Sequence, residues 1–142
     1  MSNCKIILVG SSNPEEVQFN RRIEDVVSNP RVHNQTGLTT LLDMTRLIKN
    51  AKLFIGNDSG PAHIAYLGSR KSLVFFGSVR FEERIPLNSK LKKNISCIDS
   101  RSQCDLFPCY DGLSKPKCKN NNKYSCISNI EISNELIKEL LN

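Results

Sequence analysis

The sequence of 142 residues contains no tryptophan, and aromatic residues make up only 6% of it. Proteins that hold single-stranded nucleic acid stack its bases on aromatic side chains, so this shortage argues against a nucleic-acid partner. No apolar run approaches the roughly 20 residues that a helix needs to span a bilayer. The beginning, MSNCKIILVGSS, lacks the charged-then-apolar plan of a secretion signal and reads as a first strand. These absences predict a cytoplasmic protein.

What the sequence has in excess is positive charge, with a net charge of +6. The excess is concentrated in the last third, in Lys90, Lys92, Lys93, Arg101, Lys115, Lys117, Lys119 and Lys123. A basic region of this kind can face phosphates, nucleic acid or an anionic membrane surface, and it can equally be the solvated surface of a lysine-rich chain. The charge therefore leaves open a peripheral position at the inner membrane.

Apolar runs alternate with amphipathic segments along the chain. The runs predict strands at residues 4–10, 31–37, 52–56, 72–77 and 94–99, and the amphipathic segments predict helices at residues 11–29, 39–51, 61–68 and 132–142. This alternation is typical of an α/β fold with a Rossmann-like open parallel sheet flanked by helices. Such sheets bind ligands beyond the carboxyl ends of their strands. Because Gly10, Gly56 and Gly77 end three of the predicted strands, we expect a site at that edge.

The length allows one domain with a substantial core and hardly two. We expect residues 1–100 to form the Rossmann-like domain, residues 101–128 a cysteine-rich loop and residues 129–142 a helix that packs on the same domain. Helix starts are predicted at Asn13 with Pro14, and at Thr40, which resembles a capping box with Asp43. Apolar spacing places Phe19, Ile23 and Val26 on one face of the first helix. It predicts an inner face for the second helix, made of Leu41, Met44 and Ile48.

The residues between the third strand and the third helix have the chemistry of an anion site. A helix start presents unpaired amide groups and the positive end of the helix dipole. Gly60 lets a phosphate approach the backbone closely, and Ser59 adds a hydroxyl donor. Pro61 sets the first helical residue, and His63 falls in the first turn. A diphosphate is a plausible ligand for this turn.

Asp58 complicates the anion site, because a carboxylate repels a neighbouring diphosphate. It fits if it accepts hydrogen bonds from sugar hydroxyls or fixes the loop through backbone N–H groups. The alternative is an ordinary capped helix, with His63 merely exposed. The four residues Asn-Asp-Ser-Gly do not decide between these interpretations.

A longer stretch is more specific. LFIGNDSGPAHIAYLG followed by SLVFFG closely resembles the signature of glycosyltransferase family 9, the bacterial ADP-heptose:lipopolysaccharide heptosyltransferases, with its Asp-(Ser/Thr)-Gly-x-x-His after a strand. IILVGSSNPEE and TGLTTLLDMTRLIKNAKLFIG resemble other segments of the family, so the resemblance covers nearly the whole chain. The sequence departs from the family after Gly77, where SVRFEERIP replaces the usual Thr-Asp-Pro. There, Arg80 offers a cation to phosphates.

The resemblance implies the C-terminal, nucleotide-sugar-binding half of a two-domain GT-B enzyme. In the family, the residues matching Ser59, Gly60 and His63 surround the diphosphate, with Pro61 in the same motif. The residue matching Asp58 lies near the transferred sugar.

The nucleoside end of the donor is implied by the same resemblance. The residue matching Thr39 lies near the base, and an acid in the position of Glu15 or Glu16 contacts the ribose. A one-residue gap decides between the two glutamates, and we take Glu15 as the match.

The resemblance also implies a reaction, the inverting transfer of a sugar from a nucleotide-diphosphate donor, ADP-heptose, to lipopolysaccharide core or a related surface glycan. No metal or other cofactor is expected for catalysis if the helix start and nearby cations hold the charge of the leaving diphosphate. In the family the general base and a phosphate-contacting lysine lie on the N-terminal domain. We therefore expect weak donor binding and little turnover from this chain alone, and a separate N-terminal domain chain as its partner.

Four of the six cysteines cluster late in the chain, at Cys104, Cys109, Cys118 and Cys126. Their spacing lacks the tight Cys-x2-Cys pairs of most zinc sites. A structural zinc site, one or two disulfides and free thiols all stay open.

Two other functions compete with the glycosyltransferase. The chain can be a catalytically incomplete remnant or a partner domain, which an adjacent reading frame encoding the other half would distinguish from a split enzyme. A basic zinc-binding nucleic-acid module is the third, and salt-sensitive binding to DNA or RNA would indicate it.

Overall fold

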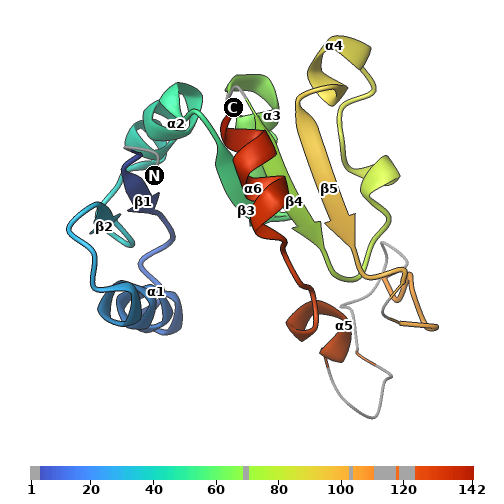
Figure 1. The fold of residues 1–142 in the computed structure, drawn as a ribbon, viewed down its shortest axis with the longest axis horizontal. Coiled ribbons are helices and arrows are strands. Elements are labelled where there is room, and N and C mark those ends of the chain that lie inside the picture. Colours follow the sequence, from blue (N-terminus) through green and yellow to red (C-terminus); the bar gives the residue numbers. More distant parts are fainter. Residues whose placement is uncertain (1–3, 69–70, 103, 111–117, 119–123) are drawn as a thin grey trace. The chain divides into compact units, whose positions relative to one another are not determined.

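The computed structural model describes residues 4–68, 71–102, 104–110, 118 and 124–142 (Figure 1). Contacts divide the chain into two units, Met1–Arg46 and Leu47–Asn142, and each unit is described by itself. No helix within the described ranges has the length and apolar character needed to cross a membrane.

The first unit is a small βαβ arrangement. It contains β1 (Ile6–Leu8), α1 (Pro14–Val27) and β2 (Val32–Asn34), and it includes the start of α2 (Leu41–Asn50). The two strands pair in parallel. The predicted helix starts are confirmed. Asn13 accepts a hydrogen bond from the Glu15 amide at 2.9 Å, and the Asp43 amide donates to Thr40 Oγ1 at 3.2 Å.

The continuous apolar run of the first strand predicts a parallel strand buried on both faces, and this is wrong, while the apolar face of α1 is also largely exposed. Ile6 and Ile7 are 53% and 42% exposed, and Phe19 and Val26 are 59% and 85% exposed. A helix of 14 residues is about 21 Å long, whereas strands of three residues extend about 10 Å. A two-stranded sheet of such strands is too small to cover the apolar face of α1.

The inner face predicted for α2 is confirmed only at its C-terminal end. Ile48 is 3% exposed, whereas Leu41 is 70% exposed. Met44, between them, is half-buried. The helix therefore packs through its last turns, and its first turn is held by the Thr40 cap.

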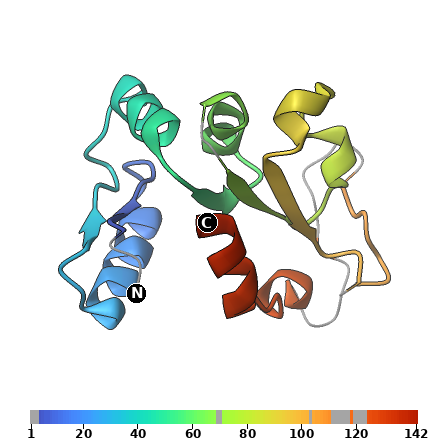
Figure 2. The ribbon, with the colours of Figure 1, turned by 45° about the horizontal axis from the view of Figure 1, so that its top comes forward.

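The second unit is a three-layer α/β arrangement around a parallel sheet with strand order β3–β4–β5. The strands are β3 (Phe54–Asn57), β4 (Ser72–Phe76) and β5 (Ile95–Asp99). On one face lies α3 (Gly60–Gly68), and on the other lies α6 (Asn134–Leu141) (Figure 2). The described chain therefore has the predicted parallel strands and flanking helices, but they form two sheets rather than one continuous sheet.

The core of the second unit is centred on β4. Leu73, Val74 and Phe76 are completely buried, because this strand has a neighbour on each side and a helix over each face. The continuous apolar run is what a central parallel strand requires. On α3, Ala62 is also completely buried, and its small side chain lets the helix approach the sheet closely.

Three short elements have no counterpart among the sequence predictions, namely η1 (Phe81–Glu83), α4 (Ser89–Lys92) and α5 (Ser125–Ser128). Each has three or four residues, which is one turn or less and too short for a periodic apolar pattern. The closing helix is confirmed as α6, where Ser133 caps the start by accepting from the Leu136 amide at 3.1 Å.

Candidate nucleotide-sugar site

The candidate site begins where β3 leads into α3, at residues 57–63, which we call the β3–α3 turn. The Asp58 amide donates to the Phe75 carbonyl at 3.0 Å, so Asp58 still lies at the edge of the sheet. The Ser59 carbonyl accepts from the Ala62 amide at 3.0 Å and closes the first turn. The helix starts at Gly60, so Pro61 occupies its second position rather than the predicted first.

The space beside Gly60 is open. A methyl group added to Gly60 would meet no atom within 4 Å, whereas one added to Gly56 would lie 2.7 Å from the Phe54 ring. The first turn of a helix also leaves amide groups without intrahelical acceptors. An anion therefore has both room and donors at the start of α3.

Asp58 lies between two basic side chains. Its Oδ1 is 3.9 Å from His63 Nε2, and its Oδ2 is 3.9 Å from Arg84 Nε. The Asp58 side chain is 21% exposed, so its carboxylate stays accessible. The structure thus brings His63 to Asp58 as the motif predicts, and it adds a cation that no pattern indicated.

Tyr66 supports His63 from one helical turn further along α3. The two rings meet edge to face, with centroids 5.4 Å apart. Tyr66 is 5% exposed, and burial is the main reason that its pKa is raised well above its ordinary value. Its hydroxyl has no hydrogen-bond partner among the described residues. Tyr66 is therefore a neutral, rigid support for the imidazole.

A cavity of about 350 Å³ lies at the carboxyl ends of β3 and β4. Its lining includes Asn57, Asp58, Gly77, Cys109, Tyr124 and Ile127. Cys109, Tyr124 and Ile127, which follow β5 in the sequence, therefore form part of the cavity wall. A methyl group added to Gly77 would meet the Ile127 side chain, so the two residues are close neighbours in the wall. The cavity is at the edge where ligands bind in sheets of this kind.

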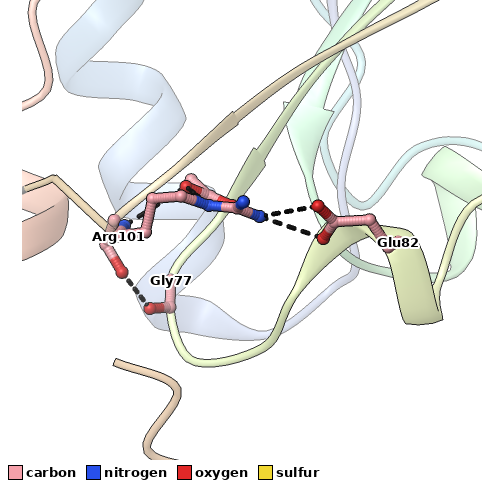
Figure 3. A network of polar contacts seen from close by, with 5 residues as sticks. Gly77, Glu82 and Arg101 are labelled. Atoms are coloured by element: carbon pink, nitrogen blue, oxygen red, sulfur yellow. Dashed lines mark hydrogen bonds and ion pairs between the residues drawn. The ribbon is translucent and has the colours of Figure 1, made fainter. Parts of the chain in front are cut away.

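The neighbouring end of β5 is tied to β4 and η1 by a polar network (Figure 3). Arg101 Nε donates to Asp99 Oδ2 at 2.7 Å, and Arg101 Nη2 donates to both carboxylate oxygens of Glu82 at 2.9 Å. Ser100 Oγ donates to the Gly77 carbonyl at 2.5 Å. Because the Asp99 side chain is only 5% exposed, it needs this cation beside it. The network fixes the loop that follows β4.

The network makes stability depend on pH through Glu82. Hydrogen bonds from its own amide and from Arg101 hold the pKa of Glu82 below its ordinary value of 4.5. A carboxyl group with a lowered pKa stabilises the fold above about pH 4.5, and this contribution is lost as the pH falls below that value.

We expect Glu82→Gln to lower the melting temperature at pH 7 and to reduce the drop in melting temperature between pH 5 and 3. Thermal unfolding across this range is the measurement. Glu83→Gln, a change at an exposed neighbour, should behave like the wild type.

The residues expected at the nucleoside lie in the first unit. The Glu16 carboxylate accepts from the Ser11 amide at 3.1 Å and from the Ser11 hydroxyl, whereas the Glu15 side chain is exposed. Thr39 Oγ1 is buried and has no hydrogen-bond partner within the described part of the chain. Since the two units are described separately, the approach of Glu15 and Thr39 to the β3–α3 turn stays a prediction.

The cysteines divide between a strand and the cavity wall. Cys97 lies in β5, where burial raises the pKa of its thiol to about 11, so it is not a reactive thiolate. Cys109 and Cys118 line the cavity. Among the described residues, no group of three or more metal-ligating side chains is close enough to hold a metal ion. The Cys126 side chain lies outside the described residues, so the state of the four-cysteine cluster stays a prediction.

Sequence reasoning missed Arg84, Tyr66 and Tyr110. Tyr110 is 5.9 Å from the guanidinium carbon of Arg84, measured to the ring centroid. Arg80, which the sequence offered as a cation for phosphates, is exposed at the start of η1, and its role stays a prediction. The i, i+3 spacing of His63 and Tyr66 on α3 was a signal that could have found Tyr66. Arg84 and Tyr110 come from other elements, so no local spacing connects them to Asp58.

Comparisons with known proteins place the chain in a family. The model of glycosyltransferase family 9 (heptosyltransferase) matches residues 1–110. Lipooligosaccharide heptosyltransferase 2 of Campylobacter jejuni subsp. jejuni serotype O:6 is 29% identical over 90 residues, which cover 63% of this chain and 28% of that protein. The enzyme of the same name from serotype O:2 is 28% identical over 89 residues, or 62% and 28% of the two chains. The matches thus span little more than a quarter of either relative. No solved structure gives a significant match.

Proposed function

Because the chain belongs to glycosyltransferase family 9, we propose that it binds a nucleotide-diphosphate sugar at the β3–α3 turn, as the donor-binding part of a heptosyltransferase-like enzyme. The observation that carries the proposal is the coincidence of Asp58, His63 and an open Gly60 beside a cavity at the carboxyl ends of β3 and β4. The names of the Campylobacter relatives favour heptose as the sugar and a lipooligosaccharide-type acceptor. ADP-heptose is the donor that we propose.

The chemistry follows from where the charge develops. In an inverting transfer, the acceptor hydroxyl attacks the anomeric carbon, and the bond from that carbon to the diphosphate oxygen breaks. The leaving diphosphate gains negative charge, which donors at the start of α3, the Ser59 hydroxyl and the His63 imidazole can stabilise. A general base must take the proton of the acceptor. We propose that this base comes from the acceptor-binding domain of the GT-B arrangement. No metal is required in this scheme, and a structural zinc at the cysteine cluster would not enter it.

Calorimetry with ADP, UDP and GDP tests the proposed function. We expect ADP to bind most tightly, because the relatives transfer heptose and the proposed donor is ADP-heptose. His63→Ala should weaken ADP binding about tenfold, the effect of losing one charge-assisted hydrogen bond. Leu67→Ala, at a residue 71% exposed on the same helix, is the matched control and should bind like the wild type. If the wild-type chain binds none of the three nucleotides, the site assignment is wrong.

A further inference from the structure

Arg84 contacts the β3–α3 turn, and the proposed function has not used its charge. It lies 26 residues after Asp58 in the sequence, yet its Nε is 3.9 Å from Asp58 Oδ2. We propose that Arg84 binds the diphosphate of the donor and that Asp58 orients it for this role. The inference rests on the proposed function and adds a residue to it.

The guanidinium of Arg84 has donors to offer. Arginine carries five N–H groups, and Asp58 faces only the one on Nε. In the described part of the chain, no hydrogen bond or ion pair engages the two terminal nitrogens of Arg84. Its side chain is 39% exposed, so a ligand can reach them. A planar pair of N–H groups matches two phosphate oxygens.

Arg101 shows what a structural arginine looks like in the same unit. Its Nε contacts Asp99, and its Nη2 contacts both oxygens of Glu82, so carboxylates already occupy its binding edge (Figure 3). Arg84 has a single carboxylate at 3.9 Å instead. The comparison separates a guanidinium whose donors are taken by two carboxylates from one whose terminal nitrogens have no such partner among the described residues.

Arg84 is positioned before a ligand binds, by its own backbone contacts and by the ring of Tyr110. The Arg84 amide donates to the Phe81 carbonyl at 3.0 Å and closes η1. The next residue, Ile85, is 8% exposed and anchors the segment in the core. The guanidinium carbon lies 5.9 Å from the Tyr110 ring centroid, and the Tyr110 amide donates to the Ser78 carbonyl at 3.1 Å. The side chain is thus held near the cavity before a ligand arrives.

This arrangement gives Asp58 a role that removes the conflict with a diphosphate. Its two oxygens face His63 and Arg84, so its charge is partly balanced on both sides. Asp58 is then a positioning residue for two side chains that present their other edges to the anion. Glu82, a carboxylate in η1, already forms an ion pair with Arg101 and so does not compete with Asp58 for Arg84.

Calorimetry of the full chain with ADP and AMP tests the inference, because the second phosphate is the group that Arg84 should recognise. We expect Arg84→Ala to weaken ADP binding about tenfold or more and to reduce the preference for ADP over AMP by a similar factor. Arg84→Lys should recover part of the loss, since it keeps the charge without the planar fork. Lys90→Ala, which removes an exposed cation in α4 of the same unit, should bind like the wild type.

Two failures are distinguishable in this experiment. If the wild type binds ADP and Arg84→Ala binds it equally tightly, the inference is wrong and the proposed function stands. If the wild type binds neither nucleotide, both are wrong. Unchanged thermal unfolding of Arg84→Ala and Arg84→Lys separates a lost contact from a lost fold.

Discussion

Replacing Phe76 with alanine is expected to lower the free energy of unfolding of the second unit by about 3–5 kcal/mol. Phe76 is completely buried in β4, and its ring lies 6.2 Å from the ring of Phe81. Removing the ring leaves a void that a strand held between two neighbours cannot close by moving. Because small domains are stable by only about 5–15 kcal/mol, the loss is a large part of the total.

Urea unfolding monitored by circular dichroism measures this effect, and Leu87→Ala is its control. Leu87 is in the same unit but 95% exposed, so its truncation should change the free energy of unfolding by less than about 0.5 kcal/mol. Phe76 also lines the cavity, so the variant should bind ADP poorly even below its unfolding transition. A loss of stability under about 1 kcal/mol would show that β4 is not the centre of the core.

Replacing Gly60 with alanine is expected to weaken ADP binding without lowering the stability of the second unit. The added methyl group meets no protein atom within 4 Å, and alanine favours a helix more than glycine does, so stability should not fall. The same methyl group would hold a diphosphate away from the first amides of α3. Losing two charge-assisted hydrogen bonds, each worth about 1.5–3 kcal/mol, weakens ADP binding about a hundredfold or more.

The Gly60→Ala experiment combines calorimetry with thermal unfolding of the same sample. Weakened binding with an unchanged or higher melting temperature supports an anion over Gly60. Unchanged binding would place the phosphates elsewhere in the cavity and leave Gly60 as an ordinary helix start. Gly77→Ala is the informative contrast, since its methyl group would displace the Ile127 side chain and so alter the cavity wall rather than the start of α3.

The sequence predicted the parts of this molecule that depend on near neighbours. The run SLVFFG became β4, and Asn13 and Thr40 became helix caps, because each interaction is made within a few residues. The compact part of the site was found for the same reason, since residues 58–63 are contiguous. Burial was harder. Helical spacing placed Phe19, Ile23 and Val26 on one face of α1, but how much of that face a partner covers depends on the size of the sheet, which no helical pattern encodes.

The position of Arg84 is an example of what the sequence could not predict. Its approach to Asp58 requires β4, the loop after it and η1 to be placed in three dimensions. The segment SVRFEERIP contains two arginines and two glutamates within five positions, and their environments differ. Nothing in their spacing distinguishes the accessible Arg84 from the exposed Arg80.

The contact between Gly77 and Ile127 has a consequence for the order in which the protein matures during synthesis. Fifty residues separate the two, so the cavity wall closes only after α5 has been made and has returned to the end of β4. Contacts this distant in sequence form late, because the intervening chain must be ordered first. A ribosome-bound chain that ends before Ile127 would have the β3–α3 turn but no finished cavity. Nucleotide binding would therefore report that the second unit has completed its folding.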